Sequence, residues 1–165
     1  MASKHNQAAR GEAARETRSR QGLEYRALLD AAVDAIIVID HRGIIQEFSQ
    51  AAQRVFGYAA DEVIGGNINL LMPEPYHSEH DGYLERYVGS RDPHIIGVGR
   101  EVRAKRKDGS LFPCDLAVGQ VQGVEPPRFI GFIRDITARK EAEERLRRSE
   151  AEQLLSAQRR SADQA

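Results

Sequence analysis

The stretch "AIIVIDHRGIIQEFSQAAQRVFG", residues 35–57, decides how the rest of the chain is interpreted. Its first five residues are apolar and mostly β-branched, so "AIIVID" predicts a buried strand, and "DHRG", which begins at its last residue, predicts a turn. "IIQEF" is then the second strand of a hairpin. Ser49 is suited to cap the helix that follows, which turns Phe56 inward, and Gly57 is suited to end it. The stretch therefore predicts a β-hairpin that leads into a short helix.

Helical and strand patterns alternate on both sides of this hairpin. Lys107, Asp108 and Gly109 form a turn signal that suits a tight connection between two further strands. The segment "LEYRALLDAAVDA" places apolar residues on one helical stripe: Leu23, Leu28, Leu29 and Val33. The remaining predicted elements are short helices within 59–66 and 67–75, a helix at 76–88, a hairpin at 95–122 and a strand at 129–134.

This order predicts an α+β fold, in which a five-stranded antiparallel sheet carries short helices on one face and a long helix follows the last strand. Residues 1–22 are polar and lack apolar periodicity, so we expect them to be disordered or a frayed helix. Residues 23–136 form the globular domain. Residues 137–165 contain no Gly or Pro and predict a long exposed helix. Its apolar residues follow a heptad poorly and suggest only a weak coiled-coil seam: Leu146, Leu154 and Leu155.

Composition excludes several classes of function. The formal net charge is −1, from 24 basic and 25 acidic residues, so charge favours neither nucleic acid nor an anionic membrane as a partner. The apolar runs are short, which predicts no bilayer span. Cys114 is the single cysteine, so no disulfide can form within the chain, and we expect a cytoplasmic protein.

The pattern "DAIIVID..G.I..FS.AA...FGY...E.IG.N...LMPEP" resembles the PAS sensor fold, and the likeness runs from Leu23 to Thr137. Within PAS domains, "MPEPYHSEHDGYLERY" followed by "DPHIIGVGREV" is similar to the heme-binding domain of FixL-type oxygen-sensing histidine kinases. The resemblance implies heme b as cofactor and O₂ as ligand, with CO and NO as alternative gases.

The resemblance also implies roles for individual residues. His80 matches the histidine that binds the iron, and His77 is a rival three residues earlier. Arg100 matches the loop arginine that pairs with a heme propionate, or donates a hydrogen bond to bound oxygen. Arg86 and His94 match positions that contact the propionates. The remaining matched or wall positions are apolar or aromatic: Ile95, Leu116 and Val118 over the oxygen-binding side (where the family usually has Ile at position 118), and Leu71, Met72, Tyr83 and Tyr87 against the porphyrin.

The sequence thus predicts a heme-based oxygen sensor that signals through its C-terminal helix, as a homodimer, to a histidine kinase or another partner. No kinase catalytic region is present in this chain, so we expect no enzymatic activity from it. Two alternatives remain. One is a cofactor-free PAS module for dimerisation or protein interaction. The other is a PAS pocket for a small carboxylate, held by Arg86 and Arg100.

Overall fold

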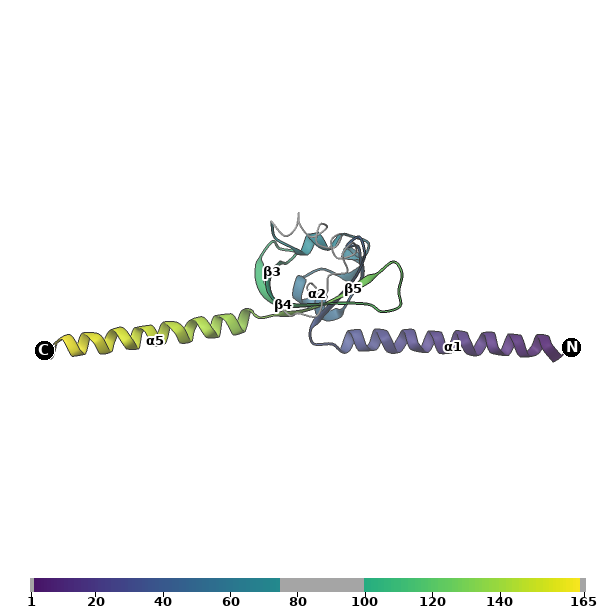
Figure 1. The fold of residues 1–165 in the computed structure, drawn as a ribbon, viewed down its shortest axis with the longest axis horizontal. Helices are drawn as coiled ribbons and strands as arrows, with labels where there is room; N and C mark the ends of the chain where they lie inside the picture. Colours follow the sequence, from purple (N-terminus) through teal and green to yellow (C-terminus); the bar gives the residue numbers. More distant parts are fainter. Residues whose placement is uncertain (1, 75–99, 164–165) are drawn as a thin grey trace.

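A five-stranded antiparallel sheet with short helices over one face forms the body of the protein, and two long helices leave it (Figure 1). The computed structural model describes residues 2–74 and 100–163, with side chains from residue 12 onward in the first range. In the sheet the strands lie in the order β2-β1-β5-β4-β3. The elements are α1 (Ala2–Ala31), β1 (Ala35–Asp40), β2 (Ile45–Phe48), α2 (Gln50–Phe56), α3 (Ala60–Val63), the 3-10 helix η1 (Ile68–Leu71), β3 (Arg100–Lys105), β4 (Leu111–Gln120), β5 (Arg128–Asp135) and α5 (Thr137–Asp163).

The predicted hairpin and its helix are confirmed. Ser49 Oγ is buried and accepts two backbone hydrogen bonds, from Ala52 N at 3.2 Å and from Ile36 N at 3.0 Å. The hydroxyl therefore caps α2 and also joins that helix to β1. Gly57 ends α2 with φ of 80°, in the left-handed region that a glycine adopts without a clash at Cβ.

The core lies between the inner face of the sheet and the short helices. Phe56 of α2 is its centre, with its ring centroid 6.1 Å from that of Phe48 and 5.6 Å from that of Phe112. Alternation along the strands brings apolar side chains to this face from all five strands. The buried core residues on the strands are Ala35, Ile37, Ile39, Ile45, Phe48, Ala104, Phe112, Cys114, Phe129 and Ile133.

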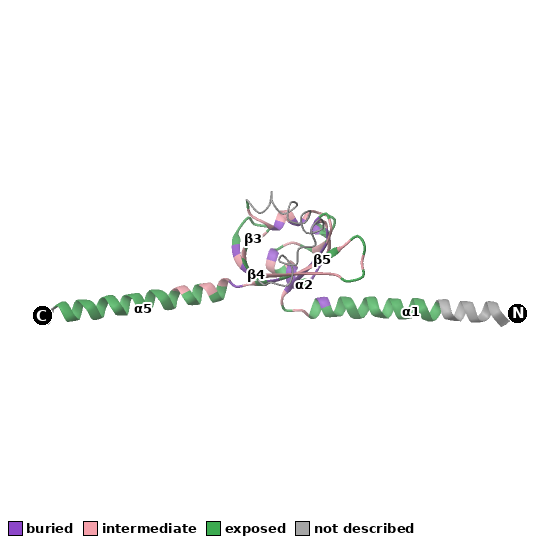
Figure 2. Ribbon diagram, viewed as in Figure 1, coloured by how far each residue is buried: buried purple, intermediate pink, exposed green. Residues whose placement is uncertain are grey.

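Helix α1 departs from the sequence prediction in two ways. It runs without a break from Ala2 to Ala31, across the expected boundary at residue 22. Of the predicted apolar stripe, only Leu29 is buried, whereas Leu23, Leu28 and Val33 are 69%, 72% and 90% exposed. We expected helices on one face of the sheet to bury their apolar positions, and for Leu23, Leu28 and Val33 this expectation is wrong. In Figure 2, the part of α1 whose burial is described (residues 12–31) is green except at the buried Leu29 near its domain end, because the helix extends away from the sheet.

Helix α5 leaves the domain on the side opposite α1 (Figure 1). It is the long exposed helix that the composition predicts, and its apolar residues Leu146, Leu154 and Leu155 remain more than half exposed. Within the described ranges no helix is both long and apolar enough to cross a membrane.

Candidate functional site

The candidate site begins at the end of the sheet where β3 starts. Arg100 is the first residue of β3 and lies opposite Leu116 of β4 in the antiparallel register. Val118, two residues after Leu116 in β4, lies opposite Gly131 of β5. Since residues opposite one another in an antiparallel pair share a face, all four positions belong to the inner face of the sheet.

Helix η1 supplies the second wall of this site, because it packs against β3. Its conformation is set locally: the Asn67 side chain accepts a hydrogen bond from Asn69 N at 2.9 Å, and Met72 N donates to Asn69 O at 3.0 Å. Leu71, at the end of η1, is buried in the core, and Met72 beside it is half-buried. The fold thus directs this helical turn onto the sheet.

Four of the predicted wall residues are brought into one apolar group. Leu71 belongs to the core cluster, while Met72, Leu116 and Val118 pack against its edge and stay partly exposed. Gly131 adds no side chain beside them. A Cβ at that position would meet side-chain or backbone atoms at 3.6–3.8 Å, an ordinary contact distance. This end of the inner face is therefore apolar and less covered than the end around Phe112, which is 2% exposed.

Arg100 is the one predicted polar site residue within the described ranges. Its side chain is exposed, and among the described residues it has no hydrogen-bond or ion-pair partner. A guanidinium at the rim of an apolar wall is suited to pair with an anionic group that enters from outside, since it stays charged and offers several donors.

The other predicted site residues lie outside the described ranges, so their roles stay predictions: His80, Tyr83, Arg86, Tyr87, His94 and Ile95. The same holds for the rival His77. Within residues 2–74 and 100–163, no group of three or more His, Cys, Asp or Glu side chains is arranged to hold a metal ion. A heme site with a single protein ligand would not require such a group.

A second polar centre, which the sequence analysis missed, lies where β5 meets α5. Arg106 Nη2 donates to Asp135 Oδ2 at 2.7 Å, and Arg106 Nη1 donates to the carbonyl oxygen of Val55 in α2. The guanidinium also lies over the Phe112 ring, with its carbon 3.9 Å from the ring centroid. Asp135 Oδ1 in turn accepts from Thr137 N at 2.9 Å and so caps α5. An Asp at position 135, just before the C-terminal helix, is a sequence signal for a helix cap. No sequence pattern near Arg106 indicates that it pairs with Asp135.

These contacts set the acidity of Asp135. Partial burial favours the neutral acid, but hydrogen bonds from Arg106 and Thr137 outweigh it and hold the pKa of Asp135 below its ordinary value. The carboxylate is therefore the form that joins α5 to the core at neutral pH.

Cys114 lies on the inner face between these two centres. It is 1% exposed, and burial, with the nearby charges of Asp135 and Asp115, raises the pKa of its thiol to about 12. The thiol is therefore protonated at neutral pH and packs as a small apolar group.

Comparison with known proteins gives a family match and several relatives. A family model described as "PAS fold" matches residues 23–136. The chain is 50% identical over 127 residues to "Sensor protein FixL" of Bradyrhizobium diazoefficiens, which covers 77% of this chain and 25% of that protein. It is 30% identical over 135 residues to "Cell-division control histidine kinase PdhS" of Brucella anthropi, which covers 81% of this chain and 13% of that kinase. The chain thus spans a quarter or less of the length of these relatives.

Solved structures show the same architecture. A PAS domain from Colwellia psychrerythraea gives a TM-score of 0.58 at 25% identity, over 70% of this chain and 98% of that domain. The PAS domain of an HTR-like protein from Haloarcula marismortui gives 0.56 at 22% identity, over 72% of this chain and 99% of that domain. Both likenesses concern the fold.

Proposed function

Since the chain belongs to the PAS family, we propose that its domain is a heme-based oxygen sensor of a signal-transduction system. The chain is related to the sensor protein FixL and to histidine kinases. In this proposal His80 holds the iron of heme b. The observation that carries it is the position of Arg100, a cation without a described partner at the rim of an apolar wall.

The described residues fit a heme. The porphyrin is a flat apolar ring, which suits the apolar group of Leu71, Met72, Leu116 and Val118. Its propionates are anions, which suit Arg100, and by resemblance Arg86 and His94. Heme iron, when bound, supplies an open coordination position for a diatomic gas.

In the proposed mechanism the residues of this chain bind the heme and change their contacts when a gas binds. The apolar group excludes water from the gas-binding side, with Ile95 as a further member by resemblance, and by the same resemblance Tyr83 and Tyr87 line the porphyrin. Arg100 would pair with a heme propionate in one state and would donate a hydrogen bond to the bound gas in the other. A gas that binds better to the second state shifts the population toward it, and this difference in affinity sets the largest response. We propose that α5 carries the response to a histidine kinase or another signalling partner, and that this chain itself is not an enzyme.

An absorption spectrum tests the proposal directly. The purified protein is reconstituted with heme and measured oxidised, then reduced under argon, then exposed to oxygen. We expect one heme per chain and a reversible spectral change with oxygen. His80→Ala should lose the heme, whereas His77→Ala, the matched control, should keep it. If no heme is retained, or if His80→Ala and the unsubstituted protein bind it equally loosely, the sensor proposal is wrong.

Arg100→Ala tests the role of the guanidinium separately. Loss of a charged hydrogen-bond donor should weaken oxygen affinity by about 10- to 100-fold. Because Arg100 contacts no described residue through a hydrogen bond or ion pair, the substitution should leave the folding stability of the heme-free protein unchanged. Unchanged oxygen affinity in this variant would remove Arg100 from the mechanism.

One observation favours a second candidate, a cofactor-free module for dimerisation. Leu146, Leu154 and Leu155 are 63%, 63% and 55% exposed on α5, and contact with a second copy of the helix would remove this apolar surface from water. This module would be colourless, and its dimer would weaken on substitution of these leucines while His80→Ala left it intact. Heme uptake distinguishes the two candidates, because only the sensor binds heme, and sedimentation of leucine variants tests whether α5 forms the dimer.

A further inference from the structure

Two carboxylates face each other on the outer side of the sheet. Glu101 of β3 lies opposite Asp115 of β4 in the antiparallel register, one position beyond the inner-facing pair of Arg100 and Leu116. Like charges directly opposite in a strand pair destabilise the pairing. This end of the β3–β4 ladder therefore needs cations nearby.

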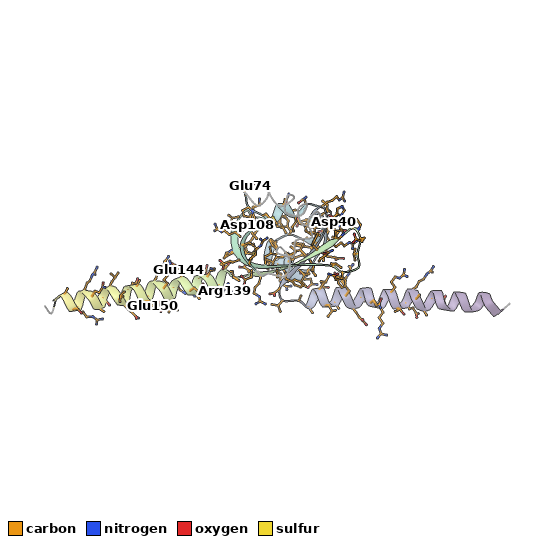
Figure 3. All side chains as sticks on the ribbon, viewed as in Figure 1. Asp40, Glu74, Asp108, Arg139, Glu144 and Glu150 are labelled. Atoms are coloured by element: carbon orange, nitrogen blue, oxygen red, sulfur yellow. The ribbon has the colours of Figure 1, made fainter. Side chains whose placement is uncertain are left out.

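The first turn of α5 supplies those cations. Lys140 Nζ lies 2.8 Å from a carboxylate oxygen of Glu101. Arg139 lies between the two acids, 3.3 Å from Asp115 and 3.9 Å from Glu101. Figure 3 labels Arg139 where α5 leaves the sheet. The hydrogen bond to Glu101 also raises the pKa of Lys140, so this lysine stays charged across the neutral range.

These ion pairs form a network, because Glu101 contacts both Lys140 and Arg139, and Arg139 contacts both Glu101 and Asp115. Arg139 contacts Glu143, one turn further along α5, as well as the sheet carboxylates. Isolated surface ion pairs contribute little to stability, but a network with several partners in fixed geometry contributes more. All four side chains are 40–51% exposed, so water screens these ion pairs and the network can rearrange at a modest cost in free energy.

Glu101 is next to Arg100 in the chain. Because successive residues of a strand point to opposite faces, Arg100 faces the core side and Glu101 faces α5. A shift of the first residues of β3 therefore moves both side chains at once. Among the ion pairs of the described residues, those that join β3 to α5 are made by Glu101.

We propose that Glu101 is the residue that couples the Arg100 end of β3 to the first turn of α5. The inference rests on the proposed function of Arg100 and deepens it by naming the next step of the signal. When Arg100 changes partner, the start of β3 shifts, Glu101 separates from Lys140 and Arg139, and the first turn of α5 loosens. Asp135 meanwhile keeps the end of β5 attached to the core through Arg106.

Amide hydrogen exchange in heme-free protein tests the attachment itself. The amide of Lys140 is bonded to the carbonyl of Ile136 at 3.0 Å, so its exchange reports opening of this turn. We expect Glu101→Gln to speed exchange of amides 139–142 about 2- to 5-fold. Lys140→Gln should act similarly, and the double variant should be little worse than either single one. Glu144→Gln is the matched control, because among the described residues Glu144 forms ion pairs with Arg147 and Arg148 alone, both within α5.

The heme-loaded protein tests the coupling. Oxygen should change the exchange of amides 139–142 in the unsubstituted chain and in Glu144→Gln, and Glu101→Gln should lose at least half of that change. Equal exchange in heme-free Glu101→Gln and Glu144→Gln, or a full oxygen response in Glu101→Gln, would overturn the inference. A chain that takes up no heme overturns the sensor proposal, and the coupling to Arg100 with it. The heme-free comparison still decides whether Glu101 holds α5.

Discussion

The side chains of Arg106 and Asp135 are 29 residues apart in the sequence and meet in an ion pair of 2.7 Å where β5 ends and α5 begins. Arg106 also reaches the carbonyl of Val55, so one guanidinium joins α2, the β3–β4 turn and the start of the exit helix. The exit helix is therefore anchored on the core side by this ion pair and on the outer side by Glu101.

Asp135→Asn should lower the free energy of unfolding by about 1–3 kcal/mol, because the substitution removes the charge from a partly buried hydrogen-bonded pair. Urea unfolding of the two proteins measures the difference. Asp34→Asn is the control, since Asp34 accepts two hydrogen bonds of 2.9 Å from the more exposed Arg134. A loss in Asp34→Asn as large as that in Asp135→Asn would contradict the role given to burial.

The stability supplied by Asp135 should depend on pH. Its pKa is lower in the folded protein than in the unfolded chain, so the unfolded state binds a proton first as pH falls. The contribution is complete above about pH 4 and is lost as pH falls through the folded pKa. The difference in unfolding free energy between the unsubstituted protein and Asp135→Asn should therefore be constant from pH 5 to 7 and shrink below about pH 4. A difference that stays constant down to pH 2 would contradict this assignment.

Ser49→Ala should destabilise the fold by about 1–3 kcal/mol, since it removes a helix cap and leaves the buried N–H of Ile36 without its acceptor. Thermal unfolding measures the effect. Ser110→Ala is the control, because Ser110 lies in an exposed turn and bonds to Asp108. It should change stability by less than about 0.5 kcal/mol.

Cys114 should not react with thiol reagents in the native state. The thiolate is the reactive form, and a pKa of about 12 leaves almost none of it near pH 8. A disulfide reagent should therefore titrate no thiol in native protein and one thiol per chain in guanidinium chloride. Ser49→Ala should react faster than the unsubstituted protein in proportion to its greater opening. Rapid reaction of the native thiol would contradict the burial of this strand.

Sequence patterns identified the strands, the caps and the order of elements because these depend on neighbours along the chain. The run at 35–40, the cap Ser49 and the αL glycine Gly57 are local, and each was found where it was expected. The same reasoning failed for Leu23, Leu28 and Val33. An apolar stripe at helical spacing does not say whether a surface is present to cover it.

The two anchors of α5 could not be found this way. Arg106 and Asp135, and likewise Glu101 and Lys140, are far apart along the chain and look like ordinary surface charges in the sequence. Strand register decides which of these charges meet. It places Glu101 opposite Asp115, and it places Asp135, the last residue of β5, opposite Cys114 of β4. The sequence by itself determined the PAS fold and the local signals within it, such as the Ser49 cap. Only the tertiary structure decided which charges hold the exit helix, since ion pairs depend on distance in space and not on periodicity.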